Sequence, residues 1–299
     1  RSTGNIEGTI PGFLIMTRLE KLFLILLFLL AFGIRLLFLI EVSESPLLMI
    51  NLLDGTDMAG YVKWGITIAS GNWLGEKVYW QAPLFPYILG CVFKHSGFSI
   101  YTACLIQAIL SALTCTIIYG ITREGMGRKA ACISSLISCF YGPFIFYSAV
   151  LLSETLGIFL ISLALFLILV SLRRQCPGIF FVSGIIFEVP SLARPNFLIF
   201  FPFVLLAILM KIKQRKAALF FTFCAGLALA IVPVTVRNYL VSNRVIFISA
   251  NAFETFRLAN SYDSCVLNFC YPEFPMMPIA SIAFWKHQLQ KAVYFWWGY

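Results

Sequence analysis

Long runs of apolar residues dominate this sequence and limit the structures that it can form. The run from 22 to 40 contains one charged residue, Arg35, and similar runs recur along most of the chain. Of the 299 residues, 60% are hydrophobic and only 12% are charged, whereas a soluble domain has nearly twice that share of charge. One soluble core cannot bury so much apolar surface. The sequence therefore predicts a polytopic membrane protein and excludes a soluble enzyme, a disordered tail and a disulfide scaffold.

The charged residues also argue against a nucleic-acid-binding protein, although the formal net charge is +9. Lysine and arginine occur in short clusters between the apolar runs, which is typical of cytoplasmic loops in membrane proteins. Most of the nine cysteines lie inside apolar runs, where cysteine acts as a small hydrophobic residue. Cys265 and Cys270 lie together in a polar stretch, where a disulfide can form. With only two histidines, a His-rich metal site is excluded.

A membrane crossing takes about 20 apolar residues, and seven stretches meet that length or come close to it. We predict helices near residues 20–40, 98–121, 130–149, 152–172, 178–193, 195–210 and 217–235. Twelve of the 22 lysine and arginine residues then fall on one side in short loops, and the positive-inside rule makes that side cytoplasmic. The expected fold class is an all-α polytopic membrane protein whose helical bundle spans the lipid bilayer.

The short spans 178–193 and 195–210 allow two interpretations. As one broken helix, they would place the basic cluster at 211–216 outside, against the charge rule. We therefore favour a hairpin with Arg194 and Pro195 at its outer tip, because proline disfavours helical geometry in the residue before it.

This topology predicts three parts of the chain. They are a cytoplasmic segment at 1–21, a transmembrane core at 22–240, and an extracytoplasmic segment at 241–299 that leads into a truncated further helix. The first outer loop of the core covers about 41–97, with a helix around 58–68 and an aromatic run on the membrane surface. The chain begins without a methionine and stops inside an aromatic run, so we expect a fragment of a longer protein.

Two acids near the outer face are candidates for chemistry. Asp57 opens the expected loop helix, and Tyr61 follows one turn later on the same face. Glu154 opens the helix at 152–172. Two carboxylates at one membrane face can serve as an acid/base pair. The alternative is that each acid only satisfies free N–H groups at a helix start.

Three arginines are expected near the same face: Arg35, Arg194 and Arg237. Each side chain could merely extend its charge to the interface. However, the positive-inside rule predicts few arginines on the outer side. Because the guanidinium group matches phosphate oxygens in a bidentate manner, the three together favour a substrate with a lipid-linked phosphate.

With these residues the sequence resembles the polytopic glycosyltransferases of the GT-C fold. In particular, it resembles the bacterial branch, of the glycosyltransferase family 39 type, that is related to dolichyl-phosphate-mannose–protein mannosyltransferases and to the aminoarabinose lipid A transferases. The shared features occur in the expected order, and they are Arg35 late in the first helix, Asp57 with Tyr61, the proline-rich run 83–87, Ser153-Glu154-Thr155, Arg194-Pro195-Asn196 and Arg237-Asn238-Tyr239.

The resemblance implies an enzyme that transfers a sugar from a polyprenyl-phosphate donor to a glycan, lipid or protein acceptor, with inversion of the anomeric centre. It places the active site on the extracytoplasmic face of a membrane, which we expect to be a bacterial inner membrane. Asp57 corresponds to the base that deprotonates the acceptor hydroxyl, and Glu154 to a supporting acid. No nucleic acid takes part, and no cofactor is required, although two carboxylates can hold a divalent metal.

The resemblance also implies the residues that bind the substrate. Cations must stabilise the charge that develops on the leaving phosphate. Relatives often carry a basic residue just before the proline-rich run, where this chain has Gln81 and Ala82, so we expect Lys77 to take that role. The expected substrate-binding residues are therefore Arg35, Tyr61, Lys77, Arg194, Arg237 and Asn238.

Two other functions stay open at this point. A transporter or flippase for a lipid-linked substrate would need charged groups near the middle of the membrane and broken or repeated helices. The sequence has no internal repeat, and both acids are expected at the membrane face. A catalytically decayed relative is the second alternative. It is favoured by Ala259, which replaces a glycine that is common in relatives.

Overall fold

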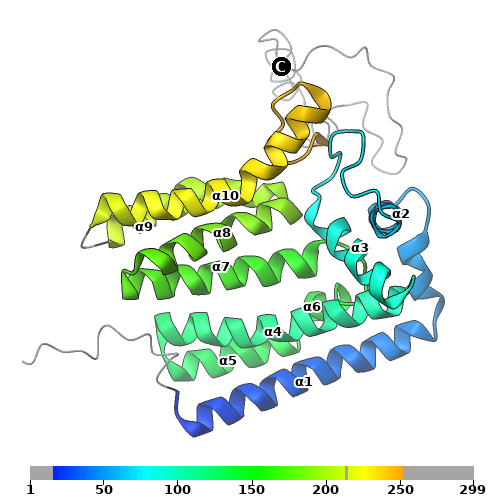
Figure 1. Cartoon of the computed structure of the whole chain (residues 1–299). Helices are drawn as coiled ribbons and strands as arrows, with labels where there is room; N and C mark the ends of the chain where they lie inside the picture. Colours follow the sequence, from blue (N-terminus) through cyan, green and yellow to red (C-terminus); the bar gives the residue numbers. More distant parts are fainter. Residues whose placement is uncertain (1–15, 213–214, 252–299) are drawn as a thin grey trace, which may run out of the picture. The chain divides into compact units, whose positions relative to one another are not determined.

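The computed structural model describes residues 16–212 and 215–251, and every regular element in these ranges is a helix. Four of the helices are long and apolar enough to cross a membrane (Figure 1). They are α1 (Arg18–Ser43), α4 (Ile100–Met126), α7 (Glu154–Arg174) and α10 (Lys216–Ser242). The prediction of an all-α polytopic membrane protein is confirmed.

The other three predicted spans are shorter or interrupted. In the stretch 130–149, α5 (Arg128–Cys139) ends early, and a short α6 (Gly142–Phe146) follows it. Gly142 and Pro143 explain the break, because glycine is a poor helix former and proline lacks the N–H that continues a helix. The sequence at 178–193 forms α8 (Pro177–Ala193). The next stretch begins as the 3₁₀-helix η4 (Pro195–Phe200) and continues as α9 (Phe201–Lys211).

The helices pack side by side in a row (Figure 1). α4 contacts α1 and α5 on one side and α7 on the other, and α8 packs between α7 and α10. A Cβ atom added at Gly184 of α8 would collide with the Phe223 carbonyl oxygen of α10, and one at Gly226 of α10 with the Phe181 carbonyl oxygen of α8. Small residues of this kind let membrane helices approach backbone to backbone.

The chain reverses at Arg194 and Pro195, between α8 and η4. Ile208 and Ile212, at the end of α9, share a buried cluster with Phe180 near the start of α8. The two helices therefore run in opposite directions, as the hairpin interpretation predicts. α9 also packs on α10.

The first predicted outer loop contains more helix than expected. The predicted helix is present as α2 (Asp57–Ala69), preceded by the 3₁₀-helix η3 (Pro46–Leu52). The proline-rich aromatic run, for which no helix was predicted, opens a second helix, α3 (Leu84–Ser96). Pro86 lies in its first turn, where no N–H is needed. The two helices pack closely, because a Cβ at Gly65 would lie 2.9 Å from the Leu89 Cβ.

Contacts divide the chain into two units. The described residues of the first run up to Val78 and from Ala82 to Ile248, and they include all the helices above. In the second, the Ala250 amide donates to the Tyr79 carbonyl oxygen at 2.8 Å and the Asn251 amide to that of Trp80 at 3.1 Å.

One end of the helical unit carries a network of arginines, and we call it the basic end. Glu20 is only 4% exposed, and its Oε1 atom accepts hydrogen bonds from Arg123 Nε at 2.9 Å and Arg128 Nε at 3.0 Å. The same atom accepts one from the Tyr119 hydroxyl at 3.2 Å. Glu124, the residue after Arg123, pairs through its Oε2 with Arg173 Nε at 3.0 Å. These contacts tie α1, α4, α5 and α7 together at their ends.

Candidate active site

The opposite end of the same helices, which we call the site end, brings both candidate acids near one tyrosine. α2 begins at Asp57 because the Thr56 side chain caps it by accepting the Ala59 amide at 3.3 Å. Asp57 is exposed, whereas Tyr61, one turn later, is only 8% exposed. The Tyr61 ring packs edge-on against Phe85, with ring centroids 5.4 Å apart and planes at 84°.

Tyr61 links α2 to the start of α7. Its hydroxyl shares a hydrogen bond with the Ser153 hydroxyl, and it interacts electrostatically with Asp57, Glu154 and Arg194. Burial raises the pKa of Tyr61, and the negative charges of Asp57 and Glu154 raise it further, while Ser153 and Arg194 act in the opposite direction. The net shift is upward, so the phenol keeps its proton at neutral pH.

Glu154 and Arg194 form an ion pair beside this tyrosine. Arg194 Nη2 contacts Glu154 Oε1, and Arg194 Nε donates to the Ser153 Oγ at 3.2 Å. The Ser153 side chain makes no capping bond to α7, so its hydroxyl takes part in the site and not in the helix start. The second carboxylate oxygen, Glu154 Oε2, is buried without a hydrogen-bond partner among the described residues. One oxygen is therefore held by Arg194, and the other is available to accept a proton or a hydrogen bond.

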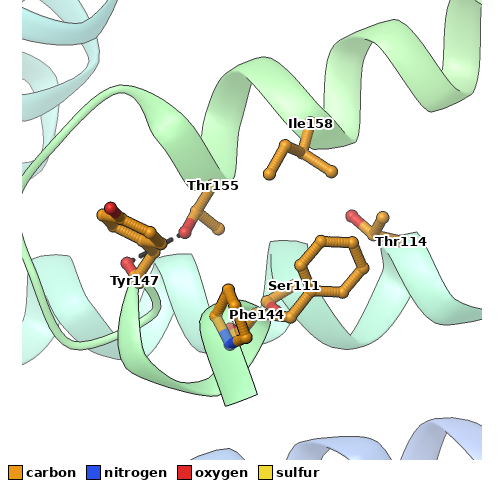
Figure 2. Close-up of a pocket in the computed structure, with 7 residues that line it drawn as sticks. Ser111, Thr114, Phe144, Tyr147, Thr155 and Ile158 are labelled. Atoms are coloured by element: carbon orange, nitrogen blue, oxygen red, sulfur yellow. Dashed lines mark hydrogen bonds between the residues drawn. The ribbon is translucent and has the colours of Figure 1, made fainter. Parts of the chain in front are cut away.

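The segment between α5 and α7 reaches the site without regular helix after α6, so its carbonyl groups need side-chain donors. The Ser111 hydroxyl donates to the Phe144 carbonyl oxygen at 2.9 Å, and the Thr155 hydroxyl to that of Tyr147 at 2.9 Å. Figure 2 shows both residues at a small pocket between α4, α6 and α7. The remaining lining residues are Thr114, Pro143, Phe144, Tyr147 and Ile158. Polar side chains from the long helices therefore fix this segment and the Glu154 that follows it.

Arg35 lies away from the acids and is fully buried. Its Nε donates to Ser111 Oγ at 2.7 Å, and Nη1 donates to the carbonyl oxygens of Ala31 at 2.9 Å and Cys139 at 3.3 Å. Nη2 contacts the Ser138 carbonyl oxygen at 3.4 Å and the Cys115 Sγ at 3.5 Å. The guanidinium thus caps the last carbonyls of α5, where a cation is favoured by the helix dipole. With all five N–H groups engaged, it has no donor left for a substrate phosphate in this structure.

The Arg237-Asn238 pair, at the end of α10, also binds the protein's own backbone. Arg237 Nε donates to the Leu74 carbonyl oxygen at 2.9 Å, and Nη2 contacts both this oxygen and the Gly75 carbonyl oxygen. Asn238 is fully buried, and its Nδ2 donates to the carbonyl oxygens of Ile246 and Ile248 at 3.2 and 3.0 Å. Arg237 therefore holds the turn at Leu74–Gly75, and exposed Lys77 follows two residues later.

The described residues contain no group of three or more His, Cys, Asp or Glu side chains that could hold a metal ion. The carboxylates of Asp57 and Glu154 come from separate segments and are the site acids that the structure brings near Tyr61. Cys265 and Cys270, the candidate disulfide, lie outside the described residues, as does Ala259.

Comparison with known proteins identifies the family. Residues 80–239, more than half of the chain, match the model of a family described as dolichyl-phosphate-mannose-protein mannosyltransferase. The chain belongs to this family. Its members are membrane glycosyltransferases of the GT-C type, so the family predicted from the sequence motifs is confirmed. No curated protein and no solved structure matches the chain.

The matched stretch includes one part of the candidate site but not the other. Glu154, Arg194 and Arg237 lie inside it, whereas Asp57 and Tyr61 lie before its first residue. The structure connects the segment before the match to the matched stretch, because Tyr61, which lies on the same helix as Asp57, bonds to Ser153.

Proposed function

We propose that this protein transfers a sugar from a polyprenyl-phosphate donor to an acceptor hydroxyl at the site end, with inversion of the anomeric centre. Its membership in a mannosyltransferase-like family supports the donor class. The observation that carries the proposal is Tyr61, which bonds to Ser153 and interacts with Asp57, Glu154 and Arg194. One buried phenol thereby interacts with two acids from separate segments and with one cation.

We assign the site end to the extracytoplasmic face. Glu20, Arg123, Arg128 and Arg173 lie at the basic end, and the positive-inside rule favours a cytoplasmic position for such a cluster. The opposite ends of the same helices carry Glu154 and Arg194. A bacterial inner membrane is the compartment that we propose.

Asp57 acts as the base in this proposal. It is exposed at the start of α2, where an acceptor hydroxyl can approach from the aqueous side. In the reaction, the acceptor oxygen attacks the anomeric carbon as its proton passes to Asp57, and the bond to the donor phosphate breaks. Proton removal by a carboxylate within hydrogen-bond reach lowers the barrier to such an attack.

Arg194 stabilises the leaving phosphate. Its side chain is 40% exposed, and Glu154 and Ser153 hold it in place. A fixed cation at the developing negative charge is the arrangement that favours phosphate departure. Lys77 supplies a second cation from the loop that Arg237 holds, so Arg237 and Asn238 contribute by positioning. Arg35 contributes by capping α5, in place of the phosphate contact expected from the sequence.

The test replaces Asp57 by asparagine. Membranes that contain the unaltered protein are supplied with polyprenyl-phosphate mannose, glucose or arabinose, and release of polyprenyl phosphate is measured, which needs no knowledge of the acceptor. We expect Asp57→Asn to abolish release while membrane insertion and donor binding persist. Asp54→Asn is the matched control, because Asp54 lies three residues earlier, is exposed and pairs with Lys63 at 2.7 Å.

Three results would overturn this function. Equal donor consumption in Asp57→Asn and the unaltered protein would remove Asp57 as the base. An unaltered protein that neither binds nor consumes any of the three donors would remove the donor class. Movement of the donor across the bilayer without release of polyprenyl phosphate would favour a flippase instead.

A further inference from the structure

Asn51 lies in η3, six residues before Asp57, and is completely buried. Its Oδ1 accepts a hydrogen bond from the Leu151 amide at 2.7 Å. Its Nδ2 donates to the carbonyl oxygens of Ala149 at 3.3 Å and of Leu48 at 3.1 Å. One side chain therefore bonds to its own loop and to two backbone groups of the segment that ends at Glu154.

We propose that Asn51 is a positioning residue that holds the Asp57 segment in register with the Glu154 segment. This inference rests on the proposed function, since it concerns the same two carboxylates. An amide is suited to the role because it presents a donor and an acceptor together. Bonds to the Ala149 carbonyl and the Leu151 amide fix both the position and the orientation of the segment relative to Asn51.

The segment needs such an anchor because α6 ends at Phe146 and α7 begins only at Glu154. Two further anchors come from α4. Gln107 Nε2 donates to the Val150 carbonyl oxygen at 2.8 Å, and the Cys104 thiol contacts that of Ala149 at 3.3 Å. These two bonds attach the segment to the bundle but not to the loop of Asp57.

Among the described residues, hydrogen bonds from two side chains of the loop reach the segment. The first is the bond between Tyr61 and Ser153, made between two side chains. The second is Asn51, which reaches the backbone itself at Ala149 and Leu151. Without Asn51, η3 and the start of α2 can shift against the Glu154 segment. A shift of about 1 Å between reacting groups can cost a hundredfold in rate.

The experiment compares Asn51→Ala with Gln107→Leu. Both remove buried hydrogen bonds to the same short segment, but only Asn51→Ala cuts the link to the Asp57 loop. Amide exchange in the peptide around Leu151 reports the link, and kcat and KM for the polyprenyl-phosphate donor report its consequence. For Asn51→Ala we expect faster exchange at Leu151 and a kcat lower by about tenfold, with KM changed by less than about twofold. For Gln107→Leu we expect kcat within about twofold of the unaltered protein.

Asn51→Asp is the second variant, in case Asn51→Ala does not fold. The aspartate keeps the acceptor for the Leu151 amide but places an oxygen against the Ala149 and Leu48 carbonyl oxygens. We expect exchange at Leu151 to stay slow while kcat falls. In the double variant Asn51→Ala/Glu154→Gln, the increase in the activation free energy should be smaller than the sum of the increases in the two single variants. The reason is that both substitutions act on the Glu154 carboxylate.

The outcomes separate the two proposals. Unchanged exchange at Leu151 in Asn51→Ala, or an unchanged kcat despite faster exchange, would overturn the Asn51 inference and leave the proposed function intact. An equal loss of kcat in Gln107→Leu would also overturn it, because anchoring to α4 would then suffice as the explanation. An unaltered protein without donor consumption would overturn the proposed function and this inference with it.

Discussion

Tyr61→Phe tests whether the site depends on one hydroxyl group. The substitution removes the bond to Ser153 but keeps the ring that packs on Phe85. A single hydrogen bond contributes about 0.5–1.5 kcal/mol. If that bond positions the reacting groups, its loss should lower kcat by roughly two- to tenfold. KM for the donor should change little, because Arg194 keeps its ion pair with Glu154.

The assay is the release of polyprenyl phosphate by membranes containing each variant at matched protein levels. Phe85→Leu is the control. It trims the buried partner of the same ring and should lower the free energy of unfolding by about 1 kcal/mol while leaving the hydroxyl in place. We expect Phe85→Leu to keep more activity than Tyr61→Phe. Full activity in Tyr61→Phe, at unchanged stability, would refute the reasoning that this phenol organises the site.

Two further predictions concern stability. Gly184→Leu should lower the free energy of unfolding in mixed detergent micelles by about 1–3 kcal/mol, because backbone atoms of α10 occupy the space that the new side chain needs. Gly178→Leu on the same helix is the control, since a Cβ there meets nothing within 4 Å and the free energy of unfolding should change little. The raised pKa of Tyr61 means that the folded protein keeps a proton that the unfolded chain loses near pH 10, so stability should fall as pH rises above about 10. Unfolding measured at about pH 8 and pH 10.5 should show a smaller fall in Tyr61→Phe; equal falls would contradict the assignment.

Hydrophobic runs predicted most of the fold because the bilayer sets helix length. The four long helices begin within about two residues of the predicted spans, but α4 and α10 continue to Met126 and Ser242, well beyond the predicted ends at 121 and 235. α2 matches its predicted stretch. α3 was missed because two prolines and several aromatic residues are also typical of a surface segment. The early end of α5 could be expected from Gly142 and Pro143, but the Arg35 cap could not.

The candidate site, like the fold, could be predicted from the sequence only in part. Topology alone places Asp57, Glu154 and Arg194 at one end of the bundle. It does not show which charges meet, because that depends on partners far apart in sequence. Arg35 illustrates the difficulty, since its acceptors Ser111 and Cys139 lie 76 and 104 residues away.

Asn51 and Gln107 were not singled out from the sequence, and Ser153 was named only as part of the Ser153-Glu154-Thr155 motif. Asn51 and Gln107 are uncharged amides within apolar stretches, and their burial at 0% and 3% is the property that matters. A polar amide in an apolar membrane segment is a usable signal, because it needs a partner there. For Ser153, only the structure shows the bonds to Tyr61 and Arg194.

The most direct test of the central claim is to map where the donor headgroup binds. A polyprenyl-phosphate mannose analogue with a photoreactive group on the sugar would be cross-linked in membranes, and the labelled peptides identified by mass spectrometry. The account predicts labelling of peptides that contain Asp57 and Tyr61, Ser153 and Glu154, or Arg194, with competition by unlabelled donor. Labelling confined to peptides of the basic end, such as the one containing Arg123 and Arg128, would contradict it.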